Sequence, residues 1–145
     1  MFKLSSLKIY LIVMTASVVI TILAIDFMVL PKITKTLIEI IPKRANVIKN
    51  RVHTLTMVFL IFVFLLDFYF WRIDNNLTEE EKKFTIALQM NPKDPSIQQK
   101  LQSIETKRKN YITLIEIIFT IILSLVIGYL AISVVQPFYQ ILGTI

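Results

Sequence analysis

Apolar residues are concentrated in three long runs along the chain. Two runs have an uncharged core, at residues 9–25 and 54–66, and in the third run, residues 111–145, Glu116 is the only charge. About twenty helical residues cross a hydrocarbon core of roughly 30 Å, and backbone inside lipid must satisfy its own hydrogen bonds. The pattern therefore predicts an all-α membrane protein with three transmembrane helices, at residues 8–30, 53–72 and 111–135.

The segment between the first two spans, residues 31–52, is basic and amphipathic. Its basic residues, against the single acid Glu39, are Lys32, Lys35, Lys43, Arg44, Lys49 and Arg51. Apolar residues recur in it at helical spacing, beginning at Ile33 and Leu37. We expect this loop to lie in the headgroup layer, where Lys32, Lys35, Lys43 and Arg44 contact anionic lipid. A solvated basic loop is the alternative.

The second connecting segment, residues 73–110, predicts a helical hairpin between helices two and three. Thr78 followed by Glu81 is a capping-box pattern at a helix start, and Asn91–Pro92 ends that helix. Pro95 begins another helix, which meets no breaker before the third span and so runs into it. A segment this short cannot build its own core, so we expect it to pack on the membrane region or on a partner. The resulting division of the chain is 1–30, 31–52, 53–72, 73–110 and 111–145, the last with a short apolar tail.

Composition limits the chemistry that the chain can perform. Hydrophobic residues make up 55% of the chain and charged residues 18%, which leaves too little polar surface for a water-facing globule. The chain has no cysteine, and Gly128 and Gly143 are its only glycines, which argues against thiolate chemistry and Gly-rich phosphate loops. His53 is the only histidine, so a His-based metal site or catalytic triad is not expected. We predict no enzyme activity, no cofactor, no metal site and no nucleic-acid partner.

Three acids, Asp26, Asp67 and Glu116, lie inside or at the edge of the predicted spans. Ionisable groups at this depth are costly and often functional. Asp67 and Glu116 each lie about one turn inside the same face of the bilayer. They either reach interfacial water or pair locally, for instance with Arg72 or Lys109, or they form an acidic site that recognises a helix of another membrane protein.

Small residues recur at packing spacing on two of the predicted helices. They are Ser17, Thr21 and Ala24 on the first helix, and Ser124, Gly128 and Ala131 on the third. Small side chains let helix backbones approach closely in lipid. We therefore predict that these two helices contact each other through the stripes, although a partner helix could use the same surfaces.

Four short motifs in a fixed order resemble those of a known family. They are Pro31–Lys32 after the first span, Asp67 near the end of the second, Leu88–Gln89–Met90–Asn91–Pro92 in the hairpin, and Lys107–Arg108–Lys109–Asn110–Tyr111–Ile112 before the third span. Over residues 20–130 their order and spacing are similar to those of the B-cell receptor-associated proteins of the endoplasmic reticulum. Individually the motifs are short, so their shared order carries the resemblance.

The resemblance implies a protein of the endoplasmic reticulum membrane that sorts or chaperones other membrane proteins through their transmembrane helices. It also implies a lumenal N-terminus and a cytosolic 31–52 segment, an orientation that charge asymmetry alone leaves open. The sequence departs from the family because no coiled coil or lysine-rich retrieval signal follows the third span, residues 125–132 lack the basic pair, and the hairpin segment is longer. The functions of the coiled coil are therefore not carried over.

A structural accessory subunit of a large membrane complex, in the mitochondrial inner membrane, is the alternative that the missing coiled coil favours. In both interpretations we expect a hetero-oligomer whose partners are membrane proteins, with lipid around it. A transporter or channel is disfavoured, because three spans would have to oligomerise and no helix is broken at the midplane.

Overall fold

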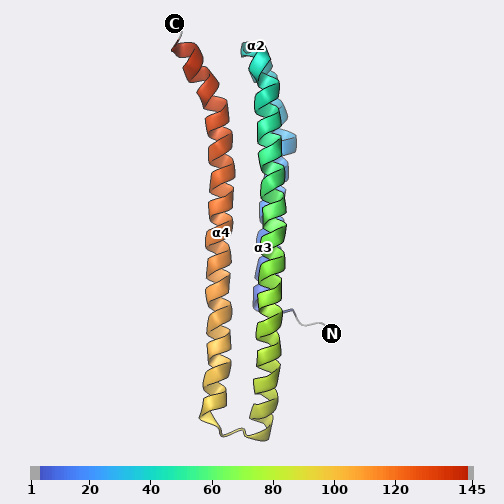
Figure 1. Cartoon of the computed structure of the whole chain (residues 1–145), viewed down its shortest axis with the longest axis vertical. Helices are drawn as coiled ribbons and strands as arrows, with labels where there is room; N and C mark the ends of the chain where they lie inside the picture. The colour runs from blue at the N-terminus through green and yellow to red at the C-terminus, as the bar shows by residue number, and fades with distance from the viewer. Residues whose placement is uncertain (1–3, 144–145) are drawn as a thin grey trace. The chain divides into compact units, whose positions relative to one another are not determined.

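The computed structural model describes residues 4–143, and all regular structure in this part of the chain is helical. Its elements are α1 (Ser6–Ala24), the π-helical turn η1 (Ile25–Val29), α2 (Leu30–Ile40), α3 (Pro42–Met90) and α4 (Pro95–Leu142) (Figure 1). Three helical stretches, Ser6–Ile40, Pro42–Met90 and Pro95–Leu142, are long and apolar enough to cross a membrane. The predicted all-α fold with three transmembrane helices is confirmed. The extreme ends of the predicted 1–30 and 111–145 segments, including Lys3, lie outside the described residues.

The first helical stretch contains a π-helical turn just before Pro31. The Leu30 N–H bonds to the Ile25 carbonyl, five residues earlier instead of four. Proline has no N–H to donate, and its ring collides with the carbonyl four residues before it. A wider turn relieves this conflict, so the helix passes Pro31 and continues to Ile40.

Residues 31–52, predicted as a loop, are helical except at Ile41. Ile41 has φ −139° and ψ 74°, outside the helical region, and its N–H bonds to the Leu37 carbonyl at 2.6 Å. Proline disfavours the helical conformation in the residue before it but fits the first position of a helix. Pro42 therefore both ends α2 and begins α3.

The second span continues without interruption to Met90, so the predicted capping box at Thr78 is wrong. Thr78 lies inside α3, and its Oγ1 donates to the Asp74 carbonyl at 2.8 Å. No glycine or proline occurs between Pro42 and Pro92 to stop the helix. The predicted end at Asn91–Pro92 and the start of the next helix at Pro95 are confirmed. The prediction that this helix runs into the third span is also confirmed, because α4 is continuous.

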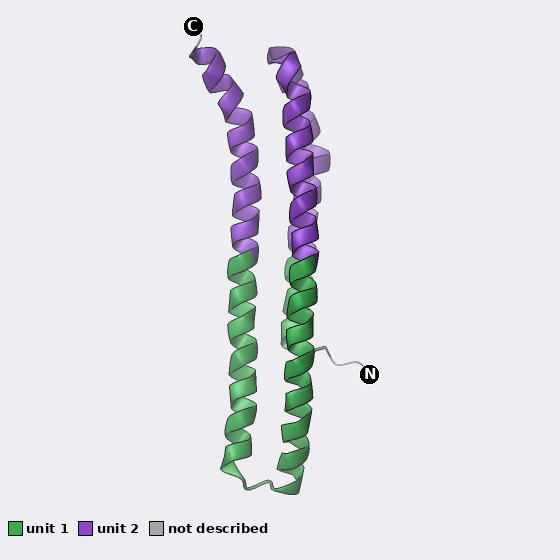
Figure 2. Ribbon diagram, viewed as in Figure 1, with its two compact units in different colours: residues 1–15, 65–118 green, residues 16–64, 119–145 purple. Residues whose placement is uncertain are grey.

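The chain divides into two compact units, and each long helix contributes to both (Figure 2). The first unit comprises residues 1–15 and 65–118, and its buried apolar residues are Leu7, Leu11, Phe70, Leu77, Ile104 and Ile115. The second comprises residues 16–64 and 119–145, and its core includes Val18, Ile22, Val52, Val63, Phe119, Ile122 and Val126. In both units the buried positions along each helix are mostly three, four or seven residues apart, the spacing of interlocking helix packing.

Large apolar side chains also cover the outside of both units. Phe27 is 68% exposed and Phe68 is 71% exposed. In the most apolar stretch of each long helix, only 17% to 22% of the residues are buried. A surface of this kind is suited to lipid or to other membrane helices rather than to water.

Candidate functional site

Asp67 and Glu116, the two acids predicted to recognise a partner helix, each meet a hydroxyl group on α1. Asp67 on α3 is partly buried and accepts a hydrogen bond from Thr15 Oγ1 at 2.6 Å. Glu116 on α4 is exposed and accepts a hydrogen bond from the Tyr10 hydroxyl. The structure therefore places both acids against the first helix, inside the first unit.

Neither acid has a cationic partner in the part of the chain that the structure describes. The predicted local alternative, pairing with Arg72 or Lys109, is not formed within residues 4–143, where Lys109 Nζ lies 3.8 Å from Glu105 instead. A carboxylate offers about four lone-pair sites, so a single hydroxyl donor leaves most of its acceptor capacity unused. Both side chains can therefore accept further hydrogen bonds from a group outside this chain.

A buried ion-pair network around Asp74 was not predicted from the sequence. Asp74 is fully buried on α3 and accepts a hydrogen bond from Ser5 Oγ at 2.7 Å. Arg108 Nε on α4 lies 3.4 Å from Asp74, and Lys8 Nζ on α1 lies 3.5 Å from it. One carboxylate on α3 thus contacts the start of α1 and Arg108 of α4.

Arg108 extends this network toward the hairpin. Its guanidinium pairs with Glu81 and donates to Thr78 Oγ1 at 3.0 Å. Asp74, Thr78 and Glu81 recur three or four residues apart, so they share one face of α3. That periodicity would have revealed the network, but the apparent helix start at Thr78 concealed it.

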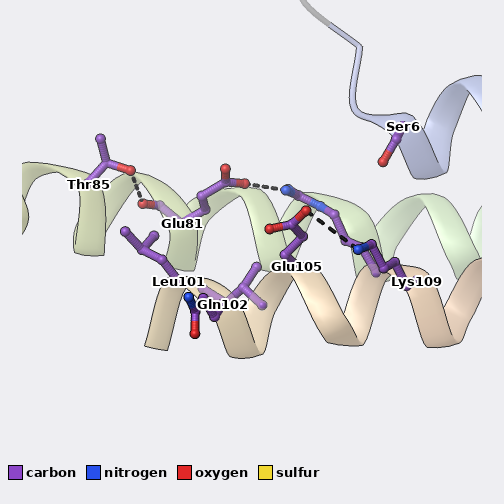
Figure 3. A pocket seen from close by; sticks show the side chains of 9 residues that line it. Ser6, Glu81, Thr85, Leu101, Gln102, Glu105 and Lys109 are labelled. Carbon is purple, nitrogen blue, oxygen red and sulfur yellow. Dashed lines mark hydrogen bonds and ion pairs between the residues drawn. The ribbon is translucent and has the colours of Figure 1, made fainter. Parts of the chain in front are cut away.

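A polar cavity of about 430 Å³ lies beside the network (Figure 3). Glu81 and Thr85 on α3 and Leu101, Glu105 and Lys109 on α4 contribute to its lining. The acids in this wall are already paired, Glu81 with Arg108 and Glu105 with Lys109. The charged side chains of the cavity are therefore already paired with one another, and the uncharged side chains of Ser6, Thr85 and Gln102 complete its polar lining.

Asp26 and His53 form a second polar contact that was not predicted, in the second unit. Asp26 is buried in η1, and both of its carboxylate oxygens lie within hydrogen-bonding distance of His53 Nδ1, at 2.8 and 2.9 Å. His53 itself is about half exposed, with 53% of its side chain accessible. Asp26 lies near the end of the first predicted span and His53 at the start of the second, so the two residues are expected at the same depth in the membrane. This shared depth is the sequence signal that could have predicted their contact.

The predicted small stripes are not a close helix contact. Ser17, Ser124 and Ala131 are exposed, Thr21 and Ala24 are partly buried, and a Cβ added at Gly128 would meet no atom within 4 Å. The buried position nearby is Val126, at 2% exposure. The expected close contact at Gly128 is therefore wrong, because bulky residues such as Val126 occupy the buried positions of this part of α4, while Ser124 and Ala131 are exposed.

The residues predicted to contact lipid headgroups are all exposed. Lys32 and Lys35 lie on α2, and Lys43 and Arg44 lie in the first turn of α3. Lys32 also borders a groove of about 220 Å³ with Thr36, Val134 and Phe138. Exposure leaves these cations available to headgroups, and headgroup contact itself stays a prediction.

The helical fold, with three helices long and apolar enough to cross a membrane, defines a class, the all-α multi-pass membrane proteins. Among residues 4–143, no three His, Asp or Glu side chains are grouped so that they could hold a metal ion. None of the protein-family models, curated proteins or solved structures compared with the chain matches it. Membership of the B-cell receptor-associated protein family stays a prediction based on the motifs between Pro31 and Ile112.

Proposed function

We propose that this protein is a non-enzymatic membrane protein that binds transmembrane helices of other membrane proteins. Following the resemblance drawn from its sequence motifs, we place it in the endoplasmic reticulum membrane, in the sorting or quality control of its clients. The observation that carries the proposal is the exposure of Glu116 together with the partners that it has. This acid is exposed within an apolar span and has a hydroxyl partner, Tyr10, but no cation within the described chain.

An exposed carboxylate surrounded by apolar side chains gains most from a donor on a neighbouring helix. Ile117 and Leu114 beside it are 51% and 43% exposed, so Glu116 lies on an apolar surface that lipid or a partner helix would cover. A Lys, Arg, Ser or Thr side chain on a partner helix would supply a hydrogen bond that lipid tails cannot. Client helices with a polar residue at this depth are therefore the ligands that the site favours.

The outer face of α4 gives independent support in the second unit. Ser124 and Ala131 are exposed, and the space over Gly128 is open. A partner helix can approach closely at such positions, which lets backbone contacts add to dispersion energy. The small residues that do not pack within the chain are thus available to a helix from outside.

Co-purification in mild detergent tests the proposal. Glu116→Leu removes the acceptor and should lower partner recovery, normalised to folded protein, by about ten- to hundredfold, the equivalent of a charge-assisted hydrogen bond of roughly 1.5–3 kcal/mol. Glu105→Gln is the control, since it also removes one carboxylate charge but lies on the exposed hairpin part of α4. Unchanged recovery with Glu116→Leu would contradict the proposal.

The alternative, an accessory subunit of a large membrane complex, is favoured by the rigid hairpin. α3 and α4 continue as unbroken helices beyond their apolar runs, as far as Met90 and from Pro95. A stiff extension of this kind suits fixed docking to one neighbour. The same purification separates the two functions, because a subunit recovers one set of partners at constant stoichiometry, whereas a chaperone recovers several clients at low occupancy.

A further inference from the structure

A groove of about 420 Å³ lies between α3 and α4 in the second unit. Its polar lining comes from Asn50, Arg51 and Thr54 on α3 and from Tyr129 on α4, and its apolar lining from Val47, Leu55 and Val58. Val47 closes the end nearest the start of α3, the polar side chains follow it, and Leu55 and Val58 lie about one to two turns beyond Arg51.

The polar groups of this groove have no partners within residues 4–143. Arg51 has no carboxylate beside it, and the Thr54 and Tyr129 hydroxyls make no hydrogen bond to another described residue. Helix threonines ordinarily bond to the carbonyl four residues earlier, as Thr21 and Thr34 do here. The Thr54 hydroxyl is therefore free. The side chains of Arg51, Thr54 and Tyr129 thus line the groove as hydrogen-bond donors that have no acceptor in the described part of the chain.

The groove also crosses the expected membrane boundary. Arg51 is the last charged residue before the uncharged run 54–66, the core of the second span. Val58 lies seven residues further along the helix, about 10 Å deeper at 1.5 Å per residue. A ligand that fills the groove must therefore carry acceptors at the boundary and an apolar part below them.

We propose that this groove binds one anionic phospholipid. The guanidinium of Arg51 suits the phosphate oxygens, which it can engage with two parallel hydrogen bonds, and the Thr54 and Tyr129 hydroxyls donate to the remaining oxygens. Leu55 and Val58 contact the upper part of an acyl chain. The excess of basic over acidic residues in residues 31–52 favours an anionic headgroup over a zwitterionic one.

Native mass spectrometry of the detergent-purified protein, titrated with dioleoyl phosphatidic acid or dioleoyl phosphatidylcholine, tests this site. Wild type should retain one phosphatidic acid in preference to phosphatidylcholine. Arg51→Gln should lower phosphatidic acid occupancy about tenfold, and Tyr129→Phe and Thr54→Val about threefold each. Arg51 and Thr54 are exposed, and Tyr129→Phe keeps the ring, so the circular dichroism spectrum of each variant should match that of wild type.

Lys49→Gln is the matched control, because it removes one positive charge from an exposed position on the same helix, outside the groove. It should leave the stoichiometric lipid in place. Equal losses for Arg51→Gln and Lys49→Gln would overturn the proposal in favour of general charge attraction. Equal retention of the two lipids by wild type would also overturn the proposal. Displacement of the lipid by inorganic phosphate would overturn it as well, because phosphate alone would then be recognised.

Discussion

Asp74 is the residue on which the first unit depends most. It is fully buried, yet one carboxylate serves Ser5, Lys8 and Arg108 from two other helices. A buried carboxylate is tolerated only when it is paired and hydrogen-bonded. Asp74 therefore fixes the register of α1 and α4 against α3 at this level.

Removing this carboxylate should destabilise the fold. Asp74→Ala leaves Arg108 and Lys8, which are themselves largely buried, without their shared counter-charge. We expect a loss of about 3 kcal/mol in the free energy of unfolding, measured by thermal unfolding in detergent. Asn75→Ala, an exposed neighbour that bonds to Lys8, should change stability by less than about 0.5 kcal/mol. Similar small effects for both variants would mean that the network does not anchor the helices.

Single residues were the least predictable part of the candidate site. The acids Asp67 and Glu116 are visible in the sequence because charges stand out in apolar runs. The burial of Asp74 and the contact of Asp26 with His53 depend on which helix faces meet, and this is decided by packing between segments far apart in the chain. The partners of Asp67 and Glu116, Thr15 and Tyr10, were concealed for the same reason.

Helix ends were predictable where they were read from a residue that stops a helix. Asn91–Pro92 and Pro95 mark the hairpin turn correctly, whereas the break between α2 and α3 was not predicted, although Pro42 is its physical cause. Arg72 was interpreted as the end of a helix, but a charge ends only the apolar run and not the helix itself. The π-helical turn at Ile25–Val29 was not expected, because its cause, Pro31, lies outside the turn.

The start of α4 is stabilised by a cap that depends on pH. Asp94 accepts hydrogen bonds from the Ser96 hydroxyl at 2.8 Å and the Ser96 N–H at 3.0 Å. These bonds, the hydroxyl first, lower the pKa of the Asp94 carboxyl from its ordinary value of 3.8. Because the folded pKa is the lower one, the cap contributes stability above the unfolded pKa and loses it as the pH falls through the folded pKa.

Ser96→Ala should raise the pKa of Asp94 toward its ordinary value, as followed by NMR titration of the carboxyl carbon. The Ser96 N–H still donates in this variant, so part of the lowering should persist. Thr106→Ala, which removes an exposed hydroxyl further along α4, should leave the pKa of Asp94 unchanged. An unaltered Asp94 pKa in the Ser96→Ala variant would show that the hydroxyl does not form the cap.

The inner face of α4 is formed by bulky residues, and this reverses the expectation for Gly128. Gly128→Ala meets no atom and improves helix propensity by up to about 1 kcal/mol, so stability in detergent should stay equal or rise. Val126→Ala opens a space in the core and should cost about 1–2 kcal/mol. Thermal unfolding of the two variants gives the comparison. A larger loss of stability for Gly128→Ala than for Val126→Ala would support the small-residue contact that the sequence predicts.

At the scale of the whole molecule, the fold class follows from hydrophobicity and length alone. Three apolar runs with two connecting segments allow little besides three spanning helices. Three further properties depend on groups outside this chain: its orientation in the membrane, its compartment and the identity of its partners. The sequence supports expectations about them only through its resemblance to the B-cell receptor-associated proteins. The exposed acid and the outward-facing small residues limit the kind of partner that fits.

Site-specific photocrosslinking at Ile117 in native membranes tests the central claim most directly. A photoreactive side chain at this exposed position, next to Glu116, should form adducts with transmembrane segments of other proteins. The same probe in a Glu116→Leu background should lose those adducts, and a probe at Lys93, in the hairpin turn, should not form them. Adducts with lipid alone at Ile117, or protein adducts that are unchanged by Glu116→Leu, would contradict helix recognition at this site.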